Sequence, residues 1–76
     1  MDNYHITYNK NSEQWQFKKS GNERPTFTAD TKADAIGKMQ SYMQNHPGSV
    51  KIHKVNNIIQ EERTYPRSID PRKTEG

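Results

Sequence analysis

The chain has 76 residues, a net charge of +3 and a hydrophobic content of 28%, which suits one small domain with a thin core. It contains no cysteine, and this excludes disulfides, thiolate metal sites and cysteine nucleophiles. No apolar run approaches the roughly 18 residues that a membrane span needs. The first residues show neither the basic nor the apolar region of a signal peptide, so we expect a cytoplasmic protein with no membrane partner.

Alternating apolar residues predict two strands near the start of the chain. Tyr4, Ile6 and Tyr8 alternate with polar residues, and Trp15 and Phe17 do the same after a short polar connection. A connection this short cannot cross over the sheet, so the two strands should form an antiparallel hairpin.

A third strand is predicted after the turn signal Ser20-Gly-Asn22. It covers residues 26–29, where Phe27 and Ala29 should face the core. Pro25 suits the first position of a strand or an edge, because it cannot donate a hydrogen bond to a neighbouring strand.

The one convincing helix signal covers residues 31–44. Thr31 precedes Asp34 by three residues, which is a variant of the capping box. Apolar residues then follow at helical spacing and form one stripe: Ala35, Ile36, Met39 and Met43. Pro47-Gly48 should stop the helix within a turn of its last apolar residue.

Two further strands and a tail complete the chain. Val50 and Ile52 alternate with polar residues and predict a fourth strand, which reaches His53. Asn56-Asn57 predicts a turn, and a fifth strand should run from Ile59, facing inward, to about residue 64. Residues 66–76 contain two prolines and no periodicity, so we expect a disordered tail.

These elements predict an α+β fold over residues 1–65: a single antiparallel sheet in the order β-β-β-α-β-β, with the helix packed on one face. The predicted core comprises Tyr4, Ile6, Tyr8, Trp15, Phe17, Phe27, Ala35, Ile36, Met39, Met43, Val50, Ile52 and Ile59. By the same alternation, the other face of the sheet is polar, as is usual for an antiparallel sheet. We take the following residues of that face as the candidate binding surface: His5, Gln14, Gln16, Lys18, Lys51, His53, Ile58 and Gln60.

Five segments follow one another in a recognisable order: Tyr4-His-Ile6, Trp15 in the next strand, Thr31-Lys-x-Asp-Ala-Ile36 at the helix start, Val50-x-Ile-His53 and Ile59-Gln-x-Glu-Arg-x-Tyr65. In this order they resemble a family of small bacterial and phage proteins, domain of unknown function 2188. Asn56-Asn57 stands where members usually have Asp-Gly. The resemblance implies a small cytoplasmic protein of bacterial or prophage origin and supplies no catalytic residues.

The sequence shows no motif for catalysis, a metal or a cofactor. Serines lack a nucleophile motif, and neither a phosphate loop nor a dinucleotide fingerprint is present. His5 and His53 fall on the same predicted face and could share a zinc ion only if their strands were neighbours and a third ligand were available. We therefore expect no enzyme, no cofactor and no metal site.

Two binding functions remain. A sheet with a free edge can add a partner strand or a second copy of the chain, so protein interaction or homo-association is the first expectation. The alternative is sequence-tolerant binding of double-stranded DNA by the outer sheet face. Residues 14–44 are similar to the arm-binding domain of phage integrases, in which a three-stranded sheet enters the major groove, and the mildly basic charge permits such contact.

Overall fold

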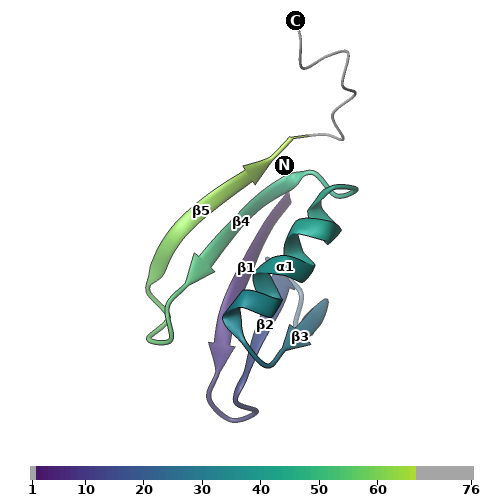
Figure 1. Cartoon of the computed structure of the whole chain (residues 1–76). Helices are drawn as coiled ribbons and strands as arrows, with labels where there is room; N and C mark the ends of the chain where they lie inside the picture. The colour runs from purple at the N-terminus through teal and green to yellow at the C-terminus, as the bar shows by residue number, and fades with distance from the viewer. Residues whose placement is uncertain (1, 67–76) are drawn as a thin grey trace, which may run out of the picture.

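The computed structural model describes residues 2–66, which form five strands and one helix around a single sheet (Figure 1). The elements are β1 (Asp2–Asn9), β2 (Gln14–Lys19), β3 (Phe27–Ala29), α1 (Lys32–Met43), β4 (Gly48–His53) and β5 (Ile59–Tyr65). The strand order is β3-β2-β1-β4-β5, and α1 lies across one face of the sheet, next to β2 and β3. The tail predicted for residues 66–76 lies outside the described residues, apart from Pro66.

Helix α1 forms where the apolar stripe and the capping signal predicted it. Thr31 has extended backbone angles, and its side-chain oxygen accepts a hydrogen bond from the Asp34 N–H at 3.1 Å. This bond satisfies one of the amide groups that a helix start leaves without a partner. The stripe points at the sheet, because Ala35, Met39 and Met43 are buried. The prediction is correct to within one residue at each end.

The sheet is mixed, so the prediction of a purely antiparallel sheet is wrong in one pairing. β4 runs parallel to β1, with Tyr4 opposite Val50 and Ile6 opposite Ile52, whereas the other three pairings are antiparallel. The physical reason is the direction of the chain. Two hairpins make β3 run the same way as β1, and α1 carries the chain back before β4 starts. β4 therefore has the direction of β1, which it meets across the crossover.

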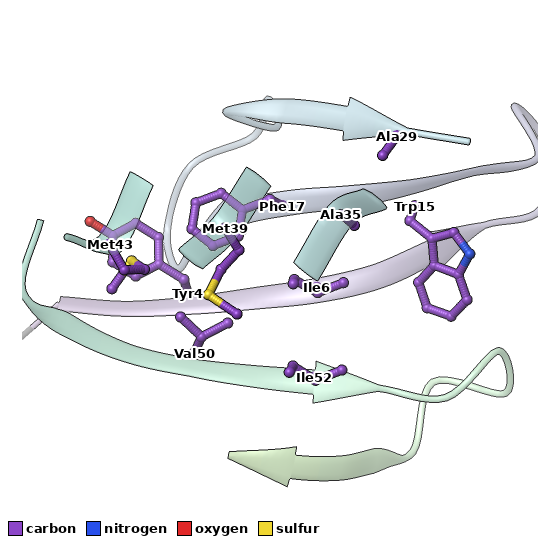
Figure 2. Close-up of a cluster of buried hydrophobic side chains, with 10 residues drawn as sticks. All are labelled: Tyr4, Ile6, Trp15, Phe17, Ala29, Ala35, Met39, Met43, Val50 and Ile52. Atoms are coloured by element: carbon purple, nitrogen blue, oxygen red, sulfur yellow. The ribbon is translucent and has the colours of Figure 1, made fainter. Parts of the chain in front are cut away.

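The core fills the space between α1 and the inner face of the sheet (Figure 2). Phe17 is fully buried at its centre, stacked between Tyr4 and Phe27 at centroid distances of 5.0 and 4.8 Å. The predicted core residues that are buried are Tyr4, Ile6, Trp15, Phe17, Ala35, Met39, Met43, Val50 and Ile52. Tyr8, Phe27 and Ile36 are half-buried and pack against this cluster, and Ala29 is buried as expected.

The start of β5 contradicts the prediction. A β-bulge lies there, because Ile52 pairs with Glu61 whereas the next residue of β4, His53, pairs with Ile59. The extra residue shifts the alternation of side chains. Ile59, predicted in the core, is therefore 50% exposed. Gln60, predicted on the outer face, accepts a hydrogen bond from the ammonium group of Lys32 at the start of α1.

Within the described part of the chain, no helix is long and apolar enough to cross a membrane.

Candidate functional site

The outer face of the sheet, opposite α1, carries a row of polar and charged side chains across four strands. Strand pairing places Lys18 of β2 next to His5 of β1, which in turn lies next to Lys51 of β4. The next residue of the row is Glu62 of β5, which is paired with Lys51 across the strands. The ammonium nitrogen of Lys51 lies 3.4 Å from the Glu62 Oε2 atom. A hydrogen bond from Ser49 and the charge of Lys51 lower the pKa of Glu62. The negative end of this row is therefore fixed at β5, and its positive part lies over β1, β2 and β4.

The two histidines of the candidate surface are in direct contact. His5 Nδ1 lies 2.9 Å from His53 Nε2, and His53 Nδ1 lies 2.9 Å from the carbonyl oxygen of Asn57. His53 is only 8% exposed, whereas His5 is half-buried. The parallel pairing of β1 with β4 produces this contact, since it makes the two strands neighbours in the sheet.

The hydrogen bonds determine which ring nitrogen of the neutral pair carries each proton. A carbonyl oxygen can only accept, so the proton of His53 is on Nδ1, and Nε2 of that ring is the acceptor. His5 must then donate from Nδ1 to His53. The remaining nitrogen, His5 Nε2, is the one ring nitrogen of the pair that has no hydrogen-bond partner within residues 2–66.

An open groove of about 290 Å³ lies over this histidine pair. Its lining contains two lysines, two histidines and hydroxyl or amide side chains, and it contains no carboxylate. The lining residues come from β1, β2, β4 and two turns: His5, Thr7, Lys18, Lys19, residues 20–22, His53 and Asn57. The Lys19 ammonium lies 3.5 Å from the Asp2 carboxylate outside the lining. The groove is therefore a polar site whose net positive charge comes mainly from Lys18.

A comparison with known families finds a match for most of the chain. Residues 4–65 match the family described as "Uncharacterized protein conserved in bacteria (DUF2188)", which covers most of the chain. The protein belongs to the DUF2188 family. No curated protein and no solved structure matches this sequence. The family assignment confirms the resemblance seen in the sequence and leaves the function to be inferred from the geometry.

This DUF2188 chain brings together only part of the predicted binding surface. His5, Lys18 and His53 line the groove, and Lys51 lies next to His5 in the charged row. Gln14 and Gln16 remain on β2 outside the groove, and the Gln14 amide donates to Asp30 at 3.2 Å. Two other predicted members do not join this surface: Ile58 lies in the turn before β5, and Gln60 contacts the helix.

Sequence reasoning predicted the turn after β2 but missed its place in the groove. Residues 20–22 line the groove, because the Ser20 N–H donates to the Asn3 carbonyl at 2.8 Å and continues the pairing with β1. Gly21 then adopts a positive φ of 92°, a conformation that favours glycine. The Ser20-Gly-Asn22 signal predicted the turn, but alternation alone does not say on which face a turn folds.

The residues of this DUF2188 chain give little support for a metal centre. Within residues 2–66, no group of three histidine or carboxylate side chains is placed to hold a metal ion. The His5–His53 pair supplies two nitrogens, whereas a catalytic zinc site has three protein ligands and a structural one has four. The lysines of the groove would also repel a cation.

We predict that acid weakens the fold through His5. Burial, and then the charges of His53 and Lys51, lower the pKa of His5 below its ordinary value of 6.5. Between 6.5 and the lowered pKa, the unfolded chain binds more protons at this position, so stability falls as the pH falls and then levels off. Urea unfolding followed by Trp15 fluorescence should show the midpoint falling between pH 7.5 and pH 5.

The His5→Gln variant should show a smaller fall of the urea midpoint between pH 7.5 and pH 5, because glutamine does not titrate. Its amide group still supplies a donor for His53. His46→Gln is the matched control, since His46 is exposed and its ring lies against Tyr42 at the end of α1. An unchanged pH slope in His5→Gln would show that His5 is not the source.

Proposed function

We propose that this protein is a non-enzymatic interaction module that associates with a second copy of itself through β5 and the turn before it. One observation carries the proposal. The exposed large hydrophobic residues among residues 2–66 are Val55, Ile58 and Ile59, which are 55%, 58% and 50% exposed. All three lie within five positions at the start of an edge strand. Single exposed apolar residues are ordinary, but a cluster beside an open edge marks a binding surface.

β5 supports this proposal by its position and its charges. It is a seven-residue edge strand that α1 does not cover (Figure 1). If two copies pair antiparallel about a two-fold axis at Glu62, each Glu61 lies opposite the Arg63 of the other copy. Opposite charges facing each other across strands stabilise a sheet. The two Glu62 side chains would meet at the axis, where each is partly neutralised by its own Lys51 at 3.4 Å.

The size of the surface indicates a weak association. A stable interface buries about 800 Å² on each partner, and three half-exposed aliphatic side chains supply only a fraction of that area. Main-chain hydrogen bonds along β5 would have to supply much of the rest. The opposite edge is a poorer candidate, because β3 has only three residues.

We predict that Ile58→Lys weakens self-association about tenfold or more, since burying an isoleucine side chain is worth roughly 1.5–3 kcal/mol. Sedimentation equilibrium over a range of concentrations measures the effect. Asn11→Lys is the control, because it adds the same charge at the exposed turn between β1 and β2. Wild-type protein that stays monomeric at millimolar concentration, or equal association in the Ile58→Lys variant, would refute the proposal.

Double-stranded DNA binding is the second candidate, and the width of the sheet limits how it could occur. Five strands spaced about 4.8 Å apart span roughly 19 Å, whereas the major groove is about 12 Å wide. Only the three strands β3, β2 and β1 could enter, which would leave Glu62 of β5 outside. The outer side of these strands carries Thr7, Gln16, Lys18 and Thr28. A duplex titration in which affinity falls steeply with salt would favour this function, and no binding at low salt would remove it.

A further inference from the structure

We propose that the groove over the His5–His53 pair is a binding site for a phosphate group. The lining holds Lys18, Lys19 and two imidazoles and lacks a carboxylate. The ammonium group of Lys19 lies 3.5 Å from the Asp2 carboxylate outside the lining, so Lys18 is the principal positive charge of the site. The turn at residues 20–22 adds a hydroxyl and an amide side chain, which can donate hydrogen bonds to phosphate oxygens. This site goes beyond self-association. Of the proposed interface, β5 contributes nothing to the lining, and the turn before it contributes only Asn57.

The histidine pair gives the site a single place to add a proton. His5 Nδ1 donates to His53 Nε2, and His53 Nδ1 donates to the Asn57 carbonyl. A proton added at His5 Nε2 leaves both hydrogen bonds intact and creates a new N–H donor with a positive charge. A proton on His53 Nε2 would instead break the contact between the rings. The neutral pair thus only accepts a hydrogen bond from a ligand, whereas the singly protonated pair can donate one to an oxyanion.

The charged groups around His5 make this proton uptake depend on the anion. Lys18 from β2 and Lys51 from β4 flank His5 in the sheet, and His53 touches it. These neighbours disfavour a positive charge on His5 when no anion is bound. Glu62 of β5 is the nearest carboxylate of the row, and it is engaged by Ser49 and Lys51. A bound dianion would offset the lysines, so anion binding and protonation of His5 should favour each other.

Two sources of the phosphate group fit this chemistry: the backbone of a nucleic acid duplex and a small phosphorylated molecule. Inorganic phosphate tests the shared chemistry, and a short mixed-sequence duplex tests the first source. Sulfate serves as the probe for the pH dependence, because its charge does not change between pH 6 and 7.5. The readout is a nitrogen–proton NMR titration that follows the amides of residues 18–22, His5 and His53.

We expect phosphate and sulfate to shift these amides, and sulfate to bind more tightly at pH 6 than at pH 7.5. Lys18→Gln should weaken binding roughly fivefold, as the loss of one partly exposed charge contact would. Lys10→Gln is the matched control, since Lys10 is exposed in the turn at the other end of β2 and does not line the groove. His5→Gln should remove the pH dependence while the fold, checked by the same spectra, persists.

Each outcome decides the proposal. Shifts with both phosphate and the duplex support a site that reads a nucleic acid backbone, and shifts with phosphate alone support a small phosphorylated ligand. Unchanged groove amides with phosphate and sulfate would overturn the site, whether or not the duplex binds. Equal affinity in Lys18→Gln and Lys10→Gln would overturn it as well. Phosphate should bind equally well at protein concentrations that favour the monomer and at those that favour the dimer, so a failure of self-association does not affect this result.

Discussion

Replacing Phe17 by alanine is expected to cost about 3–5 kcal/mol of stability. Phe17 is fully buried, is stacked on Tyr4 and Phe27, and meets the Tyr42 ring edge-on at 5.3 Å. The substitution leaves a cavity that neither the sheet nor α1 can close without moving these rings. A chain of this size is stable by only roughly 4–11 kcal/mol. Much of the variant should therefore be unfolded at low urea concentrations, as seen by circular dichroism.

Phe27→Ala is the control for this effect, because Phe27 is half-buried on the short edge strand β3. This substitution removes a phenyl ring from the same stack, and we expect a clearly smaller loss of stability. Equal losses for the two variants would contradict the central place of Phe17 in the core.

Replacing Gly48 by alanine is expected to destabilise the protein by about 1–3 kcal/mol, as overpacking of a filled interior does. Gly48 begins β4 and lies opposite Asp2 of β1. An added Cβ would lie 2.6 Å from the Asp2 carbonyl oxygen and 3.0 Å from a ring carbon of Tyr4. The first contact is with backbone, so relief requires the β1–β4 pairing itself to open. Urea unfolding measures the loss.

Gly37→Ala provides a control with the opposite sign. Gly37 lies on the exposed side of α1, and an added Cβ there meets nothing within 4 Å. Alanine should stabilise the helix at this position by about 0.5–1 kcal/mol, because glycine loses more backbone entropy on folding. A Gly48→Ala variant as stable as the wild type would show that β1 and β4 are not packed as closely as the structure has them.

The sequence predicts the local elements well, because each has a local cause. Thr31 caps the helix through its own hydroxyl, and alternation at Tyr4 and Ile6 places both in the core. The direction of β4 was also accessible, since counting chain reversals makes it run the same way as β1. The choice of β1 as its neighbour, instead of the edge at β3, depends on packing between distant residues and has no local signal.

The misplaced residues of β5 and of the groove have a different cause. The bulge inserts one residue at the start of β5, so alternation counted from Ile59 assigns both Ile59 and Gln60 to the wrong face. The contact between His5 and His53 likewise needs the parallel pairing and its register before it can be foreseen. The sequence predicted their shared face, but it could not predict the 2.9 Å contact or the groove above it.

Amide hydrogen exchange along β5, compared at low and high protein concentration, tests the proposed self-association most directly. Edge-to-edge pairing predicts that amides within residues 61–65 exchange more slowly at high concentration, while those of β3 on the opposite edge do not change. The Ile58→Lys variant should lose the concentration dependence. Exchange at β5 that is independent of concentration, in a sample shown by sedimentation to associate, would place the interface elsewhere and contradict the proposal.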